Sequence, residues 1–380
     1  MESELTEEQQ MIQQTIRRFA EEEVAPLVEE AEAQGKFPLQ LFRKMGEMGL
    51  LCIRYPQELG GGGADKVCEC ILAEELNRIC AGIAAGIMVQ GGLATNPIYH
   101  FGSPELKERI LLPAIRGEKI GAFALTEPDV GSDAASIKTR AIRHGDHYII
   151  RGSKTFITNG PICDYAVVAA TVDPERKAHG VCLFVVEKDT PGFIVTRKLE
   201  KVGNRSAETG ELLFDECRVP ASNLIGGQEG AGFDQIRDTL MSGRITYGGR
   251  ATGLAQSAYE ASLKYAKERK QFGRPIADFQ VTRFKLAQMA MKIDIMRSYT
   301  YRVARLYDAT HRVMKEASMV KLFCSETLQE ILAQAMQIHG GYGYMMEYPV
   351  QRYWRDGRLF SITEGTSEIH HLVIARECGF

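Results

Sequence analysis

The chain of 380 residues lacks several features that would assign it to a class at once. No run of about 18 apolar residues occurs, so no segment is expected to cross a bilayer. It also lacks an excess of charge, since 46 Lys and Arg residues stand against 49 Asp and Glu residues. This balance disfavours nucleic acid or an anionic membrane as partner. The acidic start, MESELTEEQQ, is neither a secretory signal nor a basic transit peptide. We therefore expect a cytoplasmic protein, or a mitochondrial matrix protein if a presequence has been removed.

The cysteines show no disulfide pattern. Nine of them lie at irregular spacing, and an odd number in a chain of this length is typical of a reducing compartment. Cys68 and Cys70 form the only close pair, and the nearest histidine in sequence is His100. A metal site needs further ligands, so none is expected, and this pair is predicted to pack as small hydrophobic side chains in a helix.

The glycine-rich segments do not form a Rossmann fingerprint. That motif requires a strand before the glycines and the start of a helix after them. Residues 60–63 are four glycines in a loop, and MQIHGGYGY (336–344) follows the predicted end of a helix. Nicotinamide binding by a Rossmann domain is therefore disfavoured.

Hydrophobic periodicity divides the chain into three predicted domains. Residues 1–115 have the helical period. Residues 116–228 contain short runs rich in β-branched and aromatic residues with frequent turns, which predicts an antiparallel barrel or sandwich. In residues 229–380 the helical period returns, and segments 248–270, 280–309 and 313–338 are long enough for a bundle of long helices. The order predicts an α+β fold with an N-terminal all-helical domain and a central small β-domain.

Two segments of the β-domain could contact a flat polar ligand. In GAFALTEPDVGSD (121–133), the hydroxyls of Thr126 and Ser132 and several backbone N–H groups could surround polar ligand atoms. In SKTFITNG (153–160), strand alternation places Phe156 and Thr158 on one face, where they could stack on and hydrogen-bond a heterocycle. The alternatives are a tight loop in the first case and ordinary core packing in the second.

Two segments of the C-terminal domain carry charged candidates. ERKQFGRPIADFQ (268–280) surrounds Phe272 with Arg269 and other basic residues, which suits phosphates and an adenine or is a solvated helix end. In ITEGTSEIHHLVIAR (362–376), Glu364 precedes a glycine and an apolar helix. A carboxylate there is more often a helix cap than a catalyst, so this segment alone leaves both roles open.

Taken together and in this order, the motifs LTEPDVGSD, KTFITNG, ERKQFG, QIHGGYG and EGTSEI resemble those of the acyl-CoA dehydrogenase family. The resemblance covers essentially the whole chain. It implies a C-terminal four-helix bundle, bound FAD, an acyl-CoA substrate, an electron-transferring flavoprotein as electron acceptor and a homotetramer.

The resemblance also implies roles for individual residues. Thr126 and Thr158 would bond the isoalloxazine edge, and Phe156, where the family usually has Trp, would lie against the ring. The full set of FAD positions is Thr126, Ser132, Phe156, Thr158, Arg269, Phe272, Gln337, Gly340, Gly341, Thr366 and Glu368. Those from Arg269 to Gly341 would reach the FAD of a neighbouring subunit. The substrate positions are Ser132, Arg244, Thr363 and Gly365.

Glu364 is the residue expected to act as base. An α-C–H beside a thioester is too weak an acid at neutral pH without a desolvated carboxylate and stabilisation of the developing enolate. In the family, the base residue's backbone N–H and an FAD hydroxyl stabilise that charge, and a hydride leaves the β-carbon for flavin N5. Some relatives carry the base immediately before Arg244, but that position is Gly243 here.

The acyl group is predicted to be uncharged and bulky. Relatives that act on straight chains commonly place Tyr before the base, whereas Thr363 should widen the cavity. Relatives specific for dicarboxyl groups place Arg and Ser in the helix at 84–88, which here reads AAGIM and carries no charge. These features favour a branched or alicyclic acyl-CoA.

Other functions of the same fold stay open from the sequence. An acyl-CoA oxidase would share the motifs but is usually much longer, and an enoyl-CoA reductase would run the reaction in reverse. A non-catalytic DNA-binding relative would need a basic C-terminal surface, but residues 346–380 mix arginines with acidic residues. Salt-dependent DNA binding would support it.

Overall fold

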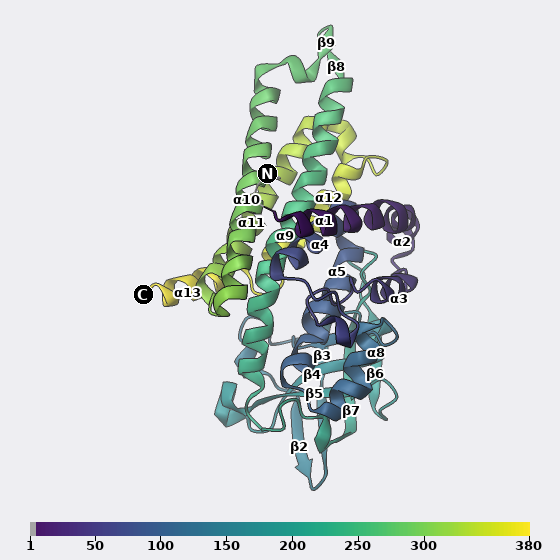
Figure 1. Cartoon of the computed structure of the whole chain (residues 1–380), viewed down its shortest axis with the longest axis vertical. Coiled ribbons are helices and arrows are strands. Elements are labelled where there is room, and N and C mark those ends of the chain that lie inside the picture. Colours follow the sequence, from purple (N-terminus) through teal and green to yellow (C-terminus); the bar gives the residue numbers. More distant parts are fainter. Residues whose placement is uncertain (1–4) are drawn as a thin grey trace.

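The computed structural model describes residues 5–380 (Figure 1). The molecule is elongated: the β-sheet occupies one end, long helices run to the other, and the N-terminal helices pack between and beside them. The N-terminal helices are α1 (Glu7–Phe19), α2 (Val28–Gln34), α3 (Gln40–Glu47), α4 (Lys66–Ile79), α5 (Ala81–Met88), α6 (Asn96–Phe101), α7 (Pro104–Leu106) and α8 (Leu112–Ile115).

Local sequence explains where the central N-terminal helices begin. Thr6 caps α1 in a capping box with Gln9, and the carboxylate of Asp65 accepts a hydrogen bond from the N–H of Cys68 at the start of α4. Most of α4 and all of α5 are buried, so these helices form the core of the N-terminal part. A π-helical turn, Val89–Ala94, continues α5, and such turns often occur at functional sites.

The central part is one curled, seven-stranded sheet. Its strands are β1 (Gly121–Ala124), β2 (Arg140–His144), β3 (His147–Thr158), β4 (Tyr165–Thr171), β5 (Val181–Glu187), β6 (Phe193–Lys198) and β7 (Thr209–Pro220). The order is β1-β4-β2-β3-β7-β6, and β5 pairs with β4. The sheet has its own core, which includes Tyr148, Phe184 and Phe214.

The sheet is mixed, whereas the sequence predicted an antiparallel one. Four pairings are antiparallel, but β1 and β2 each pair in parallel with β4. Parallel neighbours need a long crossover connection. The segment between β1 and β4 supplies it, because it contains the loop after β1 and the β2–β3 hairpin.

The C-terminal part is a helical bundle. It contains α9 (Gly232–Glu268), α10 (Gln280–Thr310), α11 (Met314–His339), α12 (Pro349–Gly357) and α13 (Ser367–Glu377), and a two-stranded hairpin, β8 (Lys270–Gln271) and β9 (Arg274–Pro275), joins α9 to α10. The three long helices pack on one another, α13 packs on α11, and α4 packs on α9 and α10. The predicted fold class is therefore confirmed, and α9 begins earlier than the predicted 248. Within residues 5–380, no helix is long and apolar enough to cross a membrane.

Candidate active site

The segment between α12 and α13 makes a turn with an unusual backbone. Glu364 has a φ of 55° and Gly365 a φ of 96°, so two consecutive residues lie in the left-handed region. For a non-glycine residue this conformation costs on the order of 1 kcal/mol and persists only where the surroundings hold it. The hydroxyl of Thr366 then caps α13 by accepting a hydrogen bond from the N–H of Ile369.

Two buried side chains hold this turn. On α11, the ammonium of Lys321 donates a hydrogen bond to the carbonyl of Gly365 at 2.6 Å, and Lys321 is fully buried. On α9, the hydroxyl of Tyr247 is hydrogen-bonded to the hydroxyl of Thr363. The residues immediately before and after Glu364 are thus tied to two different long helices.

The carboxylate of Glu364 is enclosed but only partly satisfied. Its side chain is 14% exposed, and its Oε1 lies 4.0 Å from a guanidinium nitrogen of Arg250. Its Oε2 is buried and finds no hydrogen-bond partner among the described residues. A Cβ at Gly243 would lie 2.7 Å from that oxygen, so glycine there leaves room for the carboxylate.

Burial and charge act in opposite directions on Glu364. Burial raises the pKa of the carboxyl, whereas the cations of Arg250, Lys321 and Arg244 favour the ionised form and lower it, and the net pKa is above the usual value. Burial also lowers the pKa of Lys321 to about 8. A desolvated carboxylate with a free oxygen beside nearby cations can accept a proton from a bound ligand.

Arg244 and His370 complete the surroundings of the turn. Arg244 is buried on α9, where it donates to Ser318 at 3.4 Å, and its Nε has no partner among the described residues. His370 is buried on α13 next to Gly365, and burial and nearby cations lower its pKa to about 3. A neutral imidazole therefore packs against the turn.

The β-domain presents the second set of predicted residues. A bulge in β3 between Lys154 and Ile157 breaks the strand alternation that the sequence predicted. Phe156 has a φ of 60° and is 69% exposed, while the neighbouring Ile157 is buried. Phe156 and the partly exposed Thr158 therefore still face away from the core, but through a bulge.

A buried ion pair joins the two predicted segments of the β-domain. The ammonium of Lys154 lies 2.8 Å from the carboxylate of Glu127, and both side chains are buried. The backbone N–H of Thr155 also donates to the carbonyl of Thr126 at 2.9 Å. Thr126 and Phe156 thus belong to one rigid unit, whereas Ser132 lies on an exposed stretch of the same loop.

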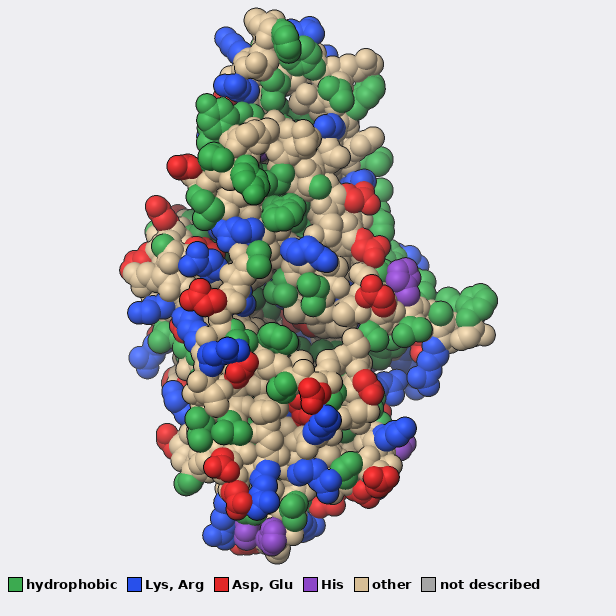
Figure 2. All heavy atoms as spheres, turned by 180° about the vertical axis from the view of Figure 1, so that it is seen from behind, with side chains coloured by type: hydrophobic (Ala, Val, Ile, Leu, Met, Phe, Trp, Pro, Cys, Tyr) green, Lys and Arg blue, Asp and Glu red, His purple; other side chains and the backbone are tan. Residues whose placement is uncertain are grey.

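The remaining predicted residues lie at the far end of the bundle. Phe272 in the β8–β9 turn is 93% exposed, Gln337 lies exposed in the last turn of α11, and Gly340 and Gly341 follow that helix and are exposed too. Figure 1 places the hairpin at the tip of the molecule, well away from α13. Hydrophobic side chains also lie on the surface of this half in Figure 2. Within one chain, these residues do not meet Glu364.

Sequence reasoning missed several residues around Glu364: Lys321, Tyr247, Arg250 and His370. A signal for two of them existed, because Gly243, Tyr247 and Arg250 follow the helical spacing that places side chains on one face of α9. No comparable signal points to Lys321, which lies in an apolar stretch of α11.

Family models match almost the whole chain. The N-terminal, middle and C-terminal domains of acyl-CoA dehydrogenase match residues 6–118, 122–217 and 230–379. The probable acyl-CoA dehydrogenase YngJ of Bacillus subtilis is 44% identical over 99% of both chains. The short-chain specific mitochondrial enzyme of Mus musculus is 42% identical over 98% of this chain and 90% of its own. The acryloyl-CoA reductase (NADH) of Anaerotignum propionicum is 42% identical over 99% of this chain and 96% of its own.

Solved structures give the same result. An acyl-CoA dehydrogenase from Geobacillus kaustophilus has a TM-score of 0.95 at 39% identity, with 99% of both chains covered. A glutaryl-CoA dehydrogenase from Mycobacterium smegmatis in complex with FADH2 has a TM-score of 0.93 at 31% identity, covering 99% of this chain and 95% of that one. The chain therefore belongs to the acyl-CoA dehydrogenase family. Like its relatives, it is a flavoprotein oxidoreductase that acts on acyl-CoA.

Proposed function

We propose that the protein catalyses α,β-dehydrogenation of an acyl-CoA thioester, with Glu364 as the base that removes the α-proton. The observation that carries the proposal is the carboxylate of Glu364, buried with one oxygen free of hydrogen bonds in a turn tied to α9 and α11. A base held in this way is already oriented when the substrate binds. Such positioning lowers the entropic part of the activation barrier and can supply a large part of an enzyme's rate enhancement.

Binding of the acyl group would make the base stronger. The side chain of Glu364 retains 14% exposure, which a bound thioester would remove. Further desolvation raises the pKa of a carboxyl and therefore its affinity for the α-proton. The charges of Arg250, Lys321 and Arg244 favour the ionised carboxylate and limit this rise.

The residues present fit FAD as the cofactor. Phe156 is an exposed aromatic side chain held in a strained bulge, and Thr126 and Thr158 lie partly exposed in the same rigid unit. Thr366 and Glu368 lie just after the base. When bound, FAD supplies the acceptor for the hydride that leaves the β-carbon. The relative solved with FADH2 supports this assignment.

The far end of the bundle would hold the adenine end of FAD in a neighbouring subunit. The β8–β9 hairpin and the end of α11 lie well away from α13, so Arg269, Phe272, Gln337, Gly340 and Gly341 do not meet Glu364 within one chain. A homotetramer, or at least a dimer, would bring such residues to a partner's site. The electron acceptor is proposed to be an electron-transferring flavoprotein.

The substrate is proposed to be an uncharged, branched or alicyclic acyl-CoA. Thr363 is smaller than an aromatic residue, and the buried segment of α5 at 84–88 carries no charge to pair with a distal carboxylate. The ring of Tyr247 fills part of the space beside Thr363, to which it is hydrogen-bonded. Thr363 and Tyr247 together would therefore shape the wall next to the α- and β-carbons.

A second candidate function is the reverse reaction, reduction of an enoyl-CoA. It is favoured by the similarity to acryloyl-CoA reductase, which matches almost the full length. The same base position would then donate the α-proton, so the site does not decide the direction.

Anaerobic titration with a panel of straight, branched, cyclic and dicarboxylic CoA thioesters tests the proposal, with flavin absorbance as readout. We expect bleaching by uncharged branched or cyclic thioesters in the parent protein and none with Glu364→Gln. Equal bleaching in both proteins would refute the role of Glu364, and an absence of bound flavin would refute the reaction.

A further inference from the structure

The three parts of the molecule meet at the segment 199–208, which joins β6 to β7. The backbone N–H and the hydroxyl of Ser206 donate to Oε1 of Glu32 on α2, at 3.0 and 2.6 Å. The backbone N–H of Asn204 donates to Oδ1 of Asp356 on α12 at 2.6 Å, and the Asn204 side chain donates to the backbone carbonyl of Asp356 at 3.0 Å. One segment of the β-domain is thus bonded to one carboxyl from each helical part.

The backbone at this junction is closely packed. Asn204 has a φ of 50°, a left-handed conformation that asparagine adopts more readily than most residues. A Cβ at Gly203 would lie 2.5 Å from the backbone of Arg355. A Cβ at Gly82, on α5, would lie 2.3 Å from Oγ of Ser206. A side chain at either glycine would displace its neighbours, so α5 and α12 lie directly against the segment.

Glu32 and Asp356 form a pair of buried carboxyls, and each has one oxygen without a hydrogen bond. Asp356 is fully buried and Glu32 is 9% exposed. Oδ2 of Asp356 and Oε2 of Glu32 find no partner among the residues that the structure describes. An ionised carboxylate in such surroundings is costly unless a cation or further donors satisfy it. Two ionised carboxylates on one short segment cost more, because like charges repel each other.

The charged or titratable groups that face the pair are Arg352 and Arg355 on α12, Cys80 directly after α4, and Lys201, Glu208 and its partner Lys198 around the segment 199–208. Arg352 donates to a backbone carbonyl at 3.2 Å, and its Nη1 has no partner among the described residues. Lys201 and Arg355 also donate to backbone carbonyls, at 2.6 and 2.8 Å. The thiol of Cys80 donates to Oε1 of Glu32 at 3.7 Å. The surrounding cations therefore bond to backbone rather than to the free carboxyl oxygens.

We propose that Asp356 carries a proton beside the carboxyl of Glu32, and that this proton holds the three parts of the molecule together in a pH-dependent way. The proton removes one of two like charges and supplies an O–H donor where the described residues offer none. Burial and then the charge of Glu32 raise the pKa of Asp356 to about 7, against the opposing effect of Arg352. Since α12 leads through Arg358–Ser361 to Glu364, the pair lies on the segment that enters the candidate active site.

The direction of the pH effect follows from the difference between the folded and unfolded states. In the unfolded chain an aspartate loses its proton near pH 4, whereas the pKa of Asp356 in the folded protein is about 7. The proton therefore contributes its full stabilisation of the folded protein below about pH 4. This stabilisation is lost as the pH rises to about 7.

The test follows thermal unfolding of the FAD-loaded protein from about pH 5 to about pH 8.5 in the parent and in Asp356→Asn. Because asparagine does not ionise, the Tm of the variant minus that of the parent should rise by about 3 °C or more over this range. A difference that does not change with pH would overturn the proposal. Glu32→Gln removes the like charge and should shift the difference in the same direction. No shift in this variant would mean that Asp356 titrates without Glu32, which overturns the pair.

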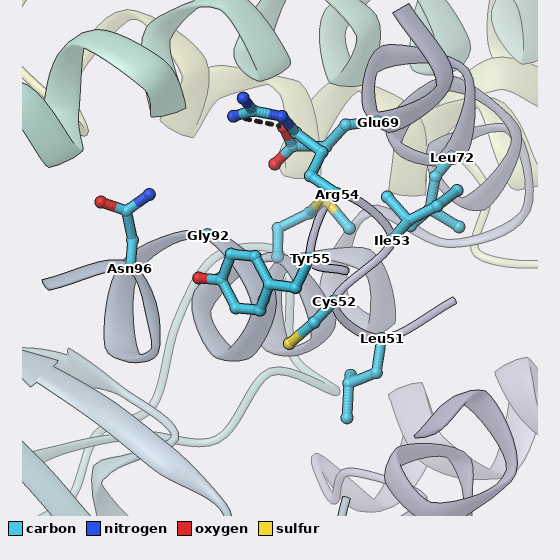
Figure 3. Close-up of a pocket in the computed structure, with 11 residues that line it drawn as sticks. Leu51, Cys52, Ile53, Arg54, Tyr55, Glu69, Leu72, Gly92 and Asn96 are labelled. Atoms are coloured by element: carbon cyan, nitrogen blue, oxygen red, sulfur yellow. Dashed lines mark ion pairs between the residues drawn. The ribbon is translucent and has the colours of Figure 1, made fainter. Parts of the chain in front are cut away.

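A matched control is Glu69 on α4, a buried carboxylate with cations beside it. Its side chain is 12% exposed, with the ammonium of Lys66 at 2.6 Å and the guanidinium of Arg54 at 3.7 Å, the second pair being marked in Figure 3. Burial raises the pKa of Glu69, but the two cations outweigh it, and the net pKa is below the usual value. The Tm difference between Glu69→Gln and the parent should therefore stay constant above about pH 5. An equal rise in this control would contradict the proposal.

Hydrogen exchange of the parent decides the matter if Asp356→Asn does not fold. Amide protection in 199–208, corrected for the intrinsic pH dependence of exchange, should fall several-fold from about pH 6 to about pH 8.5, whereas protection in β4 and β5 should not. Unchanged protection in 199–208 would overturn the proposal. These measurements use no acyl-CoA, so their outcome is independent of the proposed dehydrogenation.

Discussion

Two turns at opposite ends of the C-terminal bundle adopt the same rare backbone in different surroundings. In the turn at 363–365, Glu364 and Gly365 have φ values of 55° and 96°. In the β8–β9 hairpin, Phe272 and Gly273 have φ values of 50° and 79°. Positive φ at both central residues is what a tight hairpin requires, and Asn, Asp or Gly usually fill such positions. Glutamate and phenylalanine are costly choices at both sites, which indicates a function at each.

The surroundings distinguish the two turns. The turn at 363–365 is held by Lys321 and Tyr247 from its own chain. Phe272 is 93% exposed, and added Cβ atoms at Gly273, Gly340 and Gly341 would meet nothing within 4 Å. One site is complete within the chain. The other is an open surface, which we propose receives a partner's cofactor.

The largest expected effect comes from moving the base while keeping its surroundings. Glu364→Gly should lower kcat by about 10³–10⁴-fold, because the general base is lost. Adding Gly243→Glu should restore about tenfold or more of that loss, since a β-carbon added at 243 would lie 2.7 Å from the position that Oε2 of Glu364 now occupies. Stopped-flow flavin reduction measures both. Gly243→Gln in the same background is the control, and recovery with Gln as well as Glu would contradict a proton-abstracting role.

The next effect tests whether Lys321 holds the turn. Lys321→Met should lower kcat by about 10–100-fold, because the carbonyl of Gly365 loses its donor and the base its position. The charge of Lys321 favours ionised Glu364, so its removal should raise the pKa of the base. The acid limb of the kcat/KM pH profile should therefore move to higher pH. Lys321→Arg keeps the charge and should leave that limb in place; equal loss of rate with no shift in either variant would mean a structural role alone.

The fold could be predicted from the sequence, but the contacts that hold Glu364, the proposed base, could not. The helical and β periods give the confirmed fold class, because they follow directly from which side chains face the core. The parallel pairing of β1 with β4 depends on a crossover that local patterns do not encode. Lys321 is far from Glu364 in sequence and lies in an apolar stretch, so only tertiary packing brings them together.

The β-domain gives a second case of this limit. Phe156 and Thr158 lie outside the core on either side of the buried Ile157, as alternation predicts, but alternation gave no sign of the bulge between Lys154 and Ile157. The Glu127–Lys154 pair behind it is also a contact between separate segments. Whether the predicted residues bind FAD stays a prediction.

A smaller effect is expected on substrate selectivity when Thr363, in the turn at 363–365, is replaced. Thr363→Tyr places a large ring where the hydroxyl of Tyr247 now reaches Thr363. The ratio of kcat/KM for branched over straight thioesters should fall about tenfold, because the cavity beside the α- and β-carbons narrows. Thr363→Ser, which keeps the hydroxyl and the small size, should leave the ratio unchanged. An unchanged ratio in the Tyr variant would remove the argument for a bulky substrate.

The smallest effect on stability is expected at the end of the bundle that carries the β8–β9 hairpin. This test separates a surface completed by a partner from a turn held within its own chain. An added methyl at Gly341 meets no atom of its own chain within 4 Å, so Gly341→Ala should change the free energy of unfolding by less than about 0.5 kcal/mol. If the surface receives a partner's cofactor, the same methyl should raise the Kd for FAD several-fold, measured by flavin fluorescence on reconstitution of the apoprotein. Phe272→Ser should act in the same direction, because a 93% exposed ring contributes little to its own chain's core. Weaker FAD binding with unchanged stability is the signature of a site completed between subunits. Unchanged FAD affinity in both variants would mean that the strained hairpin serves some other contact.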